Sequence, residues 1–231
     1  LTPIGEGTMN TNATVGGVGT GQNVAGGDGV RVDYVRGISG VNAGTAYTNI
    51  SDRDHSFIAH NNVKGASATF SNISGGGNSP SANVLIKAYD DPDTATNDIG
   101  GVTYNAVGEN YVQDIITSIT ITYNGITKSA TTGTDSIIIS GVTYTLVWNS
   151  DTSGGVTVVG VVADKVSNTT IGVSTDSGLT TVEYLNDGEY LLDGELVGGQ
   201  SFKIGEFGAA VPTPGELINL DFDLQLQDAD G

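Results

Sequence analysis

The chain has 231 residues, with 8 Lys and Arg against 26 Asp and Glu, a net charge of −18 at pH 7 and no Cys. Nucleic-acid binding depends on Lys and Arg that displace counterions, so this charge balance excludes DNA and RNA as partners and disfavours anionic membranes. The absence of Cys excludes disulfides, and no apolar run approaches the roughly 18 residues that span a bilayer, so we expect no membrane insertion. The length suits one large domain with a buried core.

The first 29 residues form a lead-in rich in Gly, Thr and Asn. Gly loses the most backbone entropy on ordering, so we expect residues 1–29 to turn tightly and pack on the domain without building its core. Residues 30–231 are expected to form a single domain. Its first strand is predicted over 30–34, where apolar residues alternate with Arg31 and Asp33.

A long polar region follows from Ser39 to His60. Asp52 and Asp54 have the i, i+2 spacing that brings carboxylates into one loop concavity, which makes them calcium candidates. His55 and His60 are five residues apart, whereas zinc-binding His pairs on a helix need i, i+4 spacing. We therefore expect the two histidines to belong to solvated loops.

The next segment, residues 88–101, holds four carboxylates and an Asn within nine residues, directly after a strand predicted at 84–86. The carboxylates belong to Asp90, Asp91, Asp93 and Asp98. Like charges at this density repel one another unless a cation lies among them, and oxygen donors on a bendable loop suit calcium. The segment predicts a calcium site, and the alternative is a solvated acidic loop.

Short runs rich in β-branched residues and Thr dominate the rest of the chain. They lie at 119–123, 136–140, 144–148, 156–162, 179–185 and 220–226. Gly, Asn and Asp separate these runs, as at Asn124-Gly125, and no segment has the periodicity of an amphipathic helix. The pattern predicts an all-β protein, a β-sandwich with long acidic loops.

The motifs of common enzymes are absent from the sequence. There is no Gly-x-Ser-x-Gly elbow and no Gly-rich phosphate loop followed by Lys and Ser or Thr. Asp221 and Asp223 form a carboxylate pair, but they alternate with apolar residues along a predicted strand and lack a Glu in an evident apolar pocket. We therefore expect a protein that is not an enzyme.

Four stretches, in order along nearly the whole chain, resemble the calcium-dependent peptide-binding domains of large type I-secreted RTX bacterial adhesins. They are Gly26–Val35, Ile86–Asp91, Gly198–Gly208 and Leu224–Gly231. The resemblance implies a calcium-stabilised β-sandwich with several Ca²⁺ ions, near the tip of a longer multidomain chain on the bacterial surface. Its implied partner is a peptide or protein on a host or neighbouring cell, whose C-terminal carboxylate completes the shell of one ion.

The resemblance also implies site residues. Its metal ligands are firmest in the acidic loop, at Asp90, Asp91, Asp93 and Asp98, and extend to Asp28, Asp33, Asp52, Asp54 and Asp114. Tyrosines supply rigid contact area at low entropy cost, so Tyr89, Tyr104 and Tyr111 could flank the peptide, while Trp148 is expected in the core. Two alternatives stay open: a carbohydrate-binding adhesin module, and a structural spacer stiffened by calcium.

Overall fold

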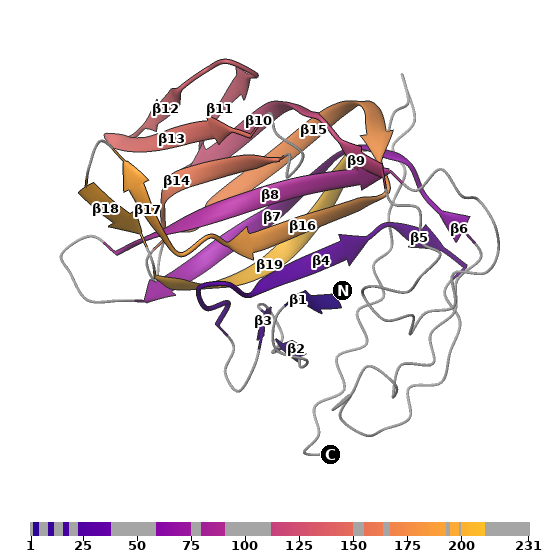
Figure 1. Ribbon diagram of the computed structural model, residues 1–231, viewed down its shortest axis with the longest axis horizontal. Helices are drawn as coiled ribbons and strands as arrows, with labels where there is room; N and C mark the ends of the chain where they lie inside the picture. The colour runs from indigo at the N-terminus through magenta and orange to yellow at the C-terminus, as the bar shows by residue number, and fades with distance from the viewer. Residues whose placement is uncertain are drawn as a thin grey trace.

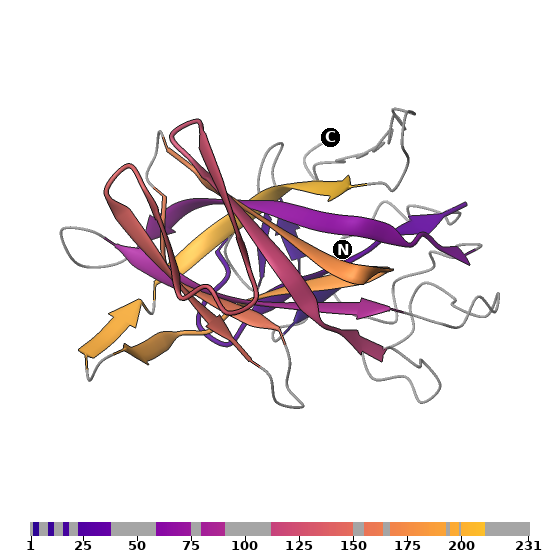
Figure 2. The same ribbon diagram turned by 90° about the horizontal axis from the view of Figure 1, so that it is seen from above.

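The computed structural model describes residues 2–4, 9–11, 16–18, 23–37, 59–74, 80–90, 112–149, 155–163, 167–192, 195–198 and 200–210. All regular structure in these ranges is β-strand, which confirms the predicted all-β class. Two large antiparallel sheets face each other as a sandwich, and Figure 2, turned from the view of Figure 1, shows them as two layers. Within these ranges there is accordingly no helix long and apolar enough to cross a membrane.

The eight-stranded sheet lies in front in Figure 1. Its strands run in the order β1 (Thr2–Ile4), β4 (Gly29–Asp33), β16 (Thr181–Asn186), β8 (Ser81–Asp90), β14 (Val156–Val162), β13 (Val142–Trp148) and β12 (Ser136–Ile139), and β9 (Val112–Asp114) also pairs with β8. The first residue of β14 pairs with Ile86, and β9 pairs with the last three residues of β8. The chain therefore returns as β9 to the end of β8.

The seven-stranded sheet lies behind it. Its order is β11 (Ile126–Thr131), β10 (Ile116–Tyr123), β15 (Thr169–Leu179), β7 (Val63–Ser74), β19 (Ser201–Ala210), β3 (Gly16–Val18) and β2 (Met9–Thr11). Two small pairs accompany the sheets: β5 (Val35–Arg36) with β6 (Ala59–His60), and β17 (Glu189–Leu192) with β18 (Glu195–Gly198). The lead-in thus contributes β1, β2 and β3 at the ends of the two sheets.

The core lies between the sheets because side chains alternate along each strand. In β8, for example, Ala82, Val84, Ile86 and Ala88 are fully buried. Aromatic side chains join the two layers: Phe70 of β7 makes an edge contact with the Tyr184 ring of β16, with centroids 5.9 Å apart. Burying each large apolar side chain contributes about 1.5–3 kcal/mol, so this interior is the main source of stability.

The alternating runs in the sequence predicted β4, β10, β12, β13 and β14 correctly, and the Asn124-Gly125 turn is confirmed by positive φ at both residues. Trp148 packs against the core as expected, and its Nε1 donates to Thr134 O at 2.9 Å. Three long strands, β7, β15 and β19, were not predicted, apart from Leu179 at the end of β15. The strand predicted at 220–226 lies outside the described ranges.

Asn186 connects three segments at one end of the sandwich. Its side chain is buried, its Nδ2 donates to Val24 O and Gln200 O at 2.9 Å each, and its Oδ1 accepts from Gly188 N at 3.0 Å. These bonds satisfy backbone groups before β4, before β19 and in the turn after β16. The side chain therefore holds the lead-in, β16 and β19 together.

Tyr184 tests how much a buried polar group without a hydrogen bond lowers the free energy of unfolding. Its hydroxyl is buried and has no hydrogen-bond partner among the described residues, and burial raises the pKa of this phenol well above its usual value. Tyr184→Phe is therefore expected to raise the free energy of unfolding by about 1 kcal/mol, because it removes an unsatisfied group. Urea denaturation measures the change.

Tyr34→Phe is the matched control, since the Tyr34 hydroxyl donates to Gly208 O at 2.9 Å. Losing this bond is expected to lower the free energy of unfolding by about 1 kcal/mol. Destabilisation by both variants would contradict the view that the Tyr184 hydroxyl lacks a partner.

Candidate functional site

Two of the acidic residues proposed from the sequence meet at one end of the eight-stranded sheet. Asp90 is the last residue of β8 and Asp114 the last residue of β9. Ala88 pairs with Asp114 and Asp90 pairs with Val112, so both carboxylates lie on the same face as the buried Ala88. The two side chains therefore lie close together at the end of the space between the sheets.

The opposite sheet reaches the same place through an irregularity in β15. The pairing of β15 with β7 shifts between Ser174 and Leu179. Gly178 has a φ of +93°, a backbone conformation that residues other than Gly rarely adopt. This local geometry brings Ser177 to β9, where its Oγ donates to Asp114 Oδ1 at 3.0 Å. In Figure 1 the end of β15 lies beside β9 and the end of β8.

The electrostatics of Asp114 favour neutralisation. Burial raises the pKa of this carboxyl, the hydrogen bond from Ser177 acts in the opposite direction, and the charge of Asp90 raises it further. Its Oδ2 is buried and has no hydrogen-bond partner among the described residues. A positive charge at this position would therefore stabilise the ionised form of Asp114.

These groups fit the chemistry of calcium, which prefers carboxylate and neutral oxygen ligands and takes six to eight of them. Within the described ranges, no three His, Cys, Asp or Glu side chains gather at one place, so Asp90 and Asp114 supply only part of such a shell. The next acidic residues after Asp90 in the sequence are Asp91, Asp93 and Asp98, and they lie outside the described ranges. Ser177 was not singled out from the sequence, because nothing in its local pattern shows that β15 meets β9.

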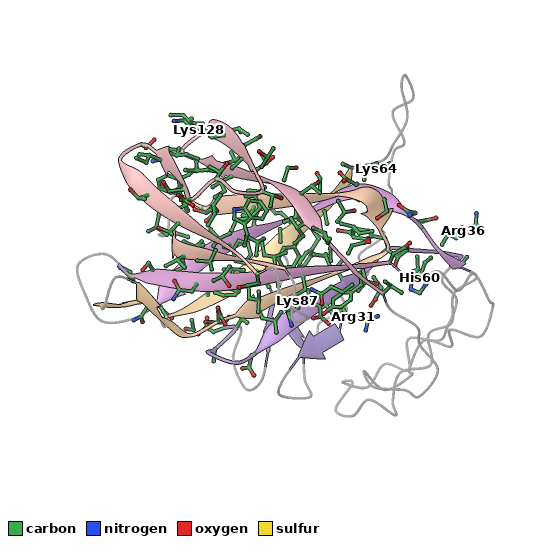
Figure 3. The ribbon with its side chains drawn as sticks, turned by 45° about the horizontal axis from the view of Figure 1, so that its top comes forward. Arg31, Arg36, His60, Lys64, Lys87 and Lys128 are labelled. Carbon is green, nitrogen blue, oxygen red and sulfur yellow. The ribbon has the colours of Figure 1, made fainter. Side chains whose placement is uncertain are left out.

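Asp33 lies at the same end of the sheet but on its outer face. Its Oδ1 accepts hydrogen bonds from Arg31 Nε at 2.8 Å and from Thr181 Oγ1 at 3.0 Å. Arg31 already neutralises this carboxylate, and Figure 3 shows Arg31 on the same side as Lys87. A role of Asp33 as a calcium ligand stays a prediction.

Tyr89 belongs to the same outer face. Its hydroxyl donates to Glu183 Oε2 at 2.9 Å, and burial, followed by the charge of Glu183, raises the pKa of the phenol. Glu183 pairs directly with Arg31 on one side and Lys87 on the other, which forms a row of alternating charge across three strands. Tyr89 is thus oriented by Glu183, and its predicted contact with a peptide stays a prediction.

The remaining candidates do not join this cluster in the described part of the chain. Asn186 N donates to Asp28 O at 2.8 Å, whereas Thr180 N donates to Tyr89 O at 2.9 Å, which places Asp28 and Tyr89 at opposite ends of β16. Asp28 is therefore too far along the sheet to share an ion with Asp90. Asp52, Asp54, Tyr104 and Tyr111 lie outside the described ranges.

Two exposed apolar side chains flank Asp114. Val112 is 56% exposed and Ile115 is 78% exposed, although most large apolar residues in the described ranges are buried. Val112 pairs with Asp90 and shares the face of the two carboxylates, so an apolar ligand at this place would contact it. Ile115 directly follows Asp114, and alternation along the chain directs its side chain to the opposite face.

Comparisons with protein-family models, with curated proteins and with solved structures found no match to this chain.

Proposed function

We propose that this protein is a calcium-dependent adhesion module that binds the C-terminal carboxylate of short peptides on the surface proteins of target cells. The observation that carries the proposal is the meeting of Asp90 and Asp114, where a buried carboxylate oxygen lacks a partner among the described residues. The acidic segment proposed as a calcium loop begins at this same point.

The charge of the protein explains why an ion would serve as the receptor. A chain with a net charge of −18 repels a peptide carboxylate, whereas a calcium ion with one open position is a local positive charge that accepts it. Val112 provides an exposed apolar contact beside that position. A bound peptide would thus gain one strong polar contact and some apolar burial.

The expected affinity for calcium suits a location outside the cell. Extracellular calcium modules have dissociation constants of about 10⁻⁴–10⁻³ M, so the ion would be held at millimolar calcium and lost in the cytosol. We therefore propose an extracellular position on the bacterial surface, as part of a longer adhesin chain with a role in cell adhesion and biofilm formation.

Peptide and glycan arrays, each run with calcium and with chelator, test the proposal. We expect calcium-dependent capture of peptides with a free C-terminal carboxylate, and no capture of the same peptides with an amidated C-terminus. Asp114→Asn is expected to lower capture strongly. Asp176→Asn is the matched control, because Asp176 is exposed in the same bulge of β15.

The two alternatives, a carbohydrate-binding module and a structural spacer, predict different results on these arrays. Binding to glycans alone would reject the peptide proposal in favour of a carbohydrate-binding module. If the protein binds calcium but no peptide and no glycan on the arrays, the result would favour a structural spacer.

A further inference from the structure

A second buried oxygen faces the candidate cation site from the opposite sheet. Thr175 of β15 is 6% exposed, and its Oγ1 has no hydrogen-bond partner among the described residues. Thr175 pairs directly with Ile116 of β10, and Ile116 lies two residues after Asp114, where the chain passes from the eight-stranded to the seven-stranded sheet. Thr175 lies on the same face of β15 as the buried Val173. The hydroxyl of Thr175 therefore points into the space between the sheets next to Asp114.

Ser177 lies two residues after Thr175 on β15 and contacts Asp114 directly. Its Oγ donates to Asp114 Oδ1 at 3.0 Å. Lys64 Nζ and Asn62 Nδ2 donate to the carbonyl of Ser177, at 3.4 and 3.5 Å. The carbonyl is thereby occupied, and the hydroxyl is the group of Ser177 that faces the carboxylate.

Two oxygens from different sheets thus lack partners at the same end of the sandwich: Oδ2 of Asp114 and Oγ1 of Thr175. A buried polar atom without a hydrogen bond costs about 1–3 kcal/mol, and the cost is larger for a charged group. One bound cation would remove both penalties, because each atom is an oxygen of the type that calcium binds.

We propose that Thr175 and Ser177 complete the cation site that Asp90 and Asp114 begin, so that one divalent cation links the two sheets at this end of the sandwich. The inference rests on the cation binding in the proposed function, but not on its peptide ligand. Binding would then do more than neutralise the carboxylates, because it would join β15 of one sheet to β8 and β9 of the other.

Calcium affinity in single-hydroxyl variants tests the contribution of β15. Thr175→Val keeps the branched shape without the hydroxyl, and Ser177→Ala removes only the Oγ. We expect each variant to bind calcium about fivefold to tenfold more weakly by isothermal titration calorimetry, since the loss of one polar contact of about 1–1.4 kcal/mol corresponds to this range. Ser174→Ala is the control, because Ser174 lies on the same strand with its side chain on the opposite face, and it should bind calcium like the wild type.

Hydrogen exchange tests the link between the sheets. Calcium is expected to slow amide exchange in β8 and β9 and also in 175–179 of β15, and this second protection should be lost in both hydroxyl variants. Melting curves in EDTA verify that each variant is folded, and Ser177→Ala keeps the test valid if Thr175→Val does not fold.

Wild-type calcium affinity in both variants would overturn the inference, since a bridging water would then account for the buried oxygens. Protection confined to β8 and β9, or no calcium binding by the wild type, would overturn it as well. If calcium binds and protects both sheets while no peptide is captured, the peptide function fails and the link between the sheets stands.

Discussion

Asn186→Ala is expected to lower the free energy of unfolding by about 3 kcal/mol or more, because it leaves two backbone groups without their partner at about 1–3 kcal/mol each and removes one of two hydrogen bonds from a third. The two groups are Gln200 O and Gly188 N, while Val24 O keeps its bond from Phe202 N at 3.2 Å. Asn186 is 1% exposed, so water cannot readily replace its side chain. The loss is shared by segments far apart in the chain, so unfolding should remain cooperative. Urea denaturation followed by tryptophan fluorescence measures it.

Two further variants sharpen this test. Asn186→Asp keeps an acceptor for Gly188 N but loses both donated bonds, so it is also expected to be destabilised. Asn168→Ala changes an exposed Asn just before β15 and is expected to stay within about 0.5 kcal/mol of the wild type. If Asn186→Ala unfolds at the same urea concentration as the wild type, the turn after β16 does not depend on this side chain.

Removal of calcium is expected to produce the second large effect. With a dissociation constant of about 10⁻⁴ M, 10 mM calcium adds about 2.7 kcal/mol per site to the stability of the folded state. For a protein of this size that free energy corresponds to a rise of about 5–10 °C in the melting temperature. Differential scanning calorimetry in calcium, in magnesium and in EDTA measures it, and magnesium is expected to have little effect because it demands a tighter octahedral shell.

Asp114→Asn is expected to change which protein is more stable, the variant or the wild type, when EDTA is replaced by calcium. In EDTA the variant is expected to melt at or above the wild type, because the repulsion between Asp90 and Asp114 is gone. In calcium it is expected to melt below the wild type by the contribution of this one site. Identical melting of the wild type in EDTA and in calcium would contradict the whole calcium interpretation.

Where the sequence has strong contrast between apolar and polar positions, it predicted the strands well. Thr and Ile alternate through β10, and β13 and β14 are dense in β-branched residues, so a period of two is visible without any partner strand. The strand β7 has no such contrast. Its first half, Val63–Thr69, is mostly Gly, Ala, Ser and Thr, and it is a strand because β15 and β19 pair with it on both sides.

In the candidate site, too, some residues could be predicted from the sequence and others only from the tertiary structure. The density of carboxylates after β8 is a property of the sequence, and the acidic cation loop that it indicates after Asp90 stays a prediction. Asp114 was proposed only through a family resemblance, and Ser177 and Thr175 were not proposed at all. Nothing local distinguishes these two residues from the many other Ser and Thr of the chain.

By itself, the sequence determined that this protein is built from β-strands and that it carries a large negative charge, because both properties depend on composition and on residues adjacent in the chain. Only the tertiary structure decided which of those charges meet. The return of β9 to the end of β8 places Asp114 beside Asp90, and the bulge in β15 brings the hydroxyl of Ser177 from the other sheet to Asp114. Such contacts depend on strand pairing over long separations, which no local pattern encodes.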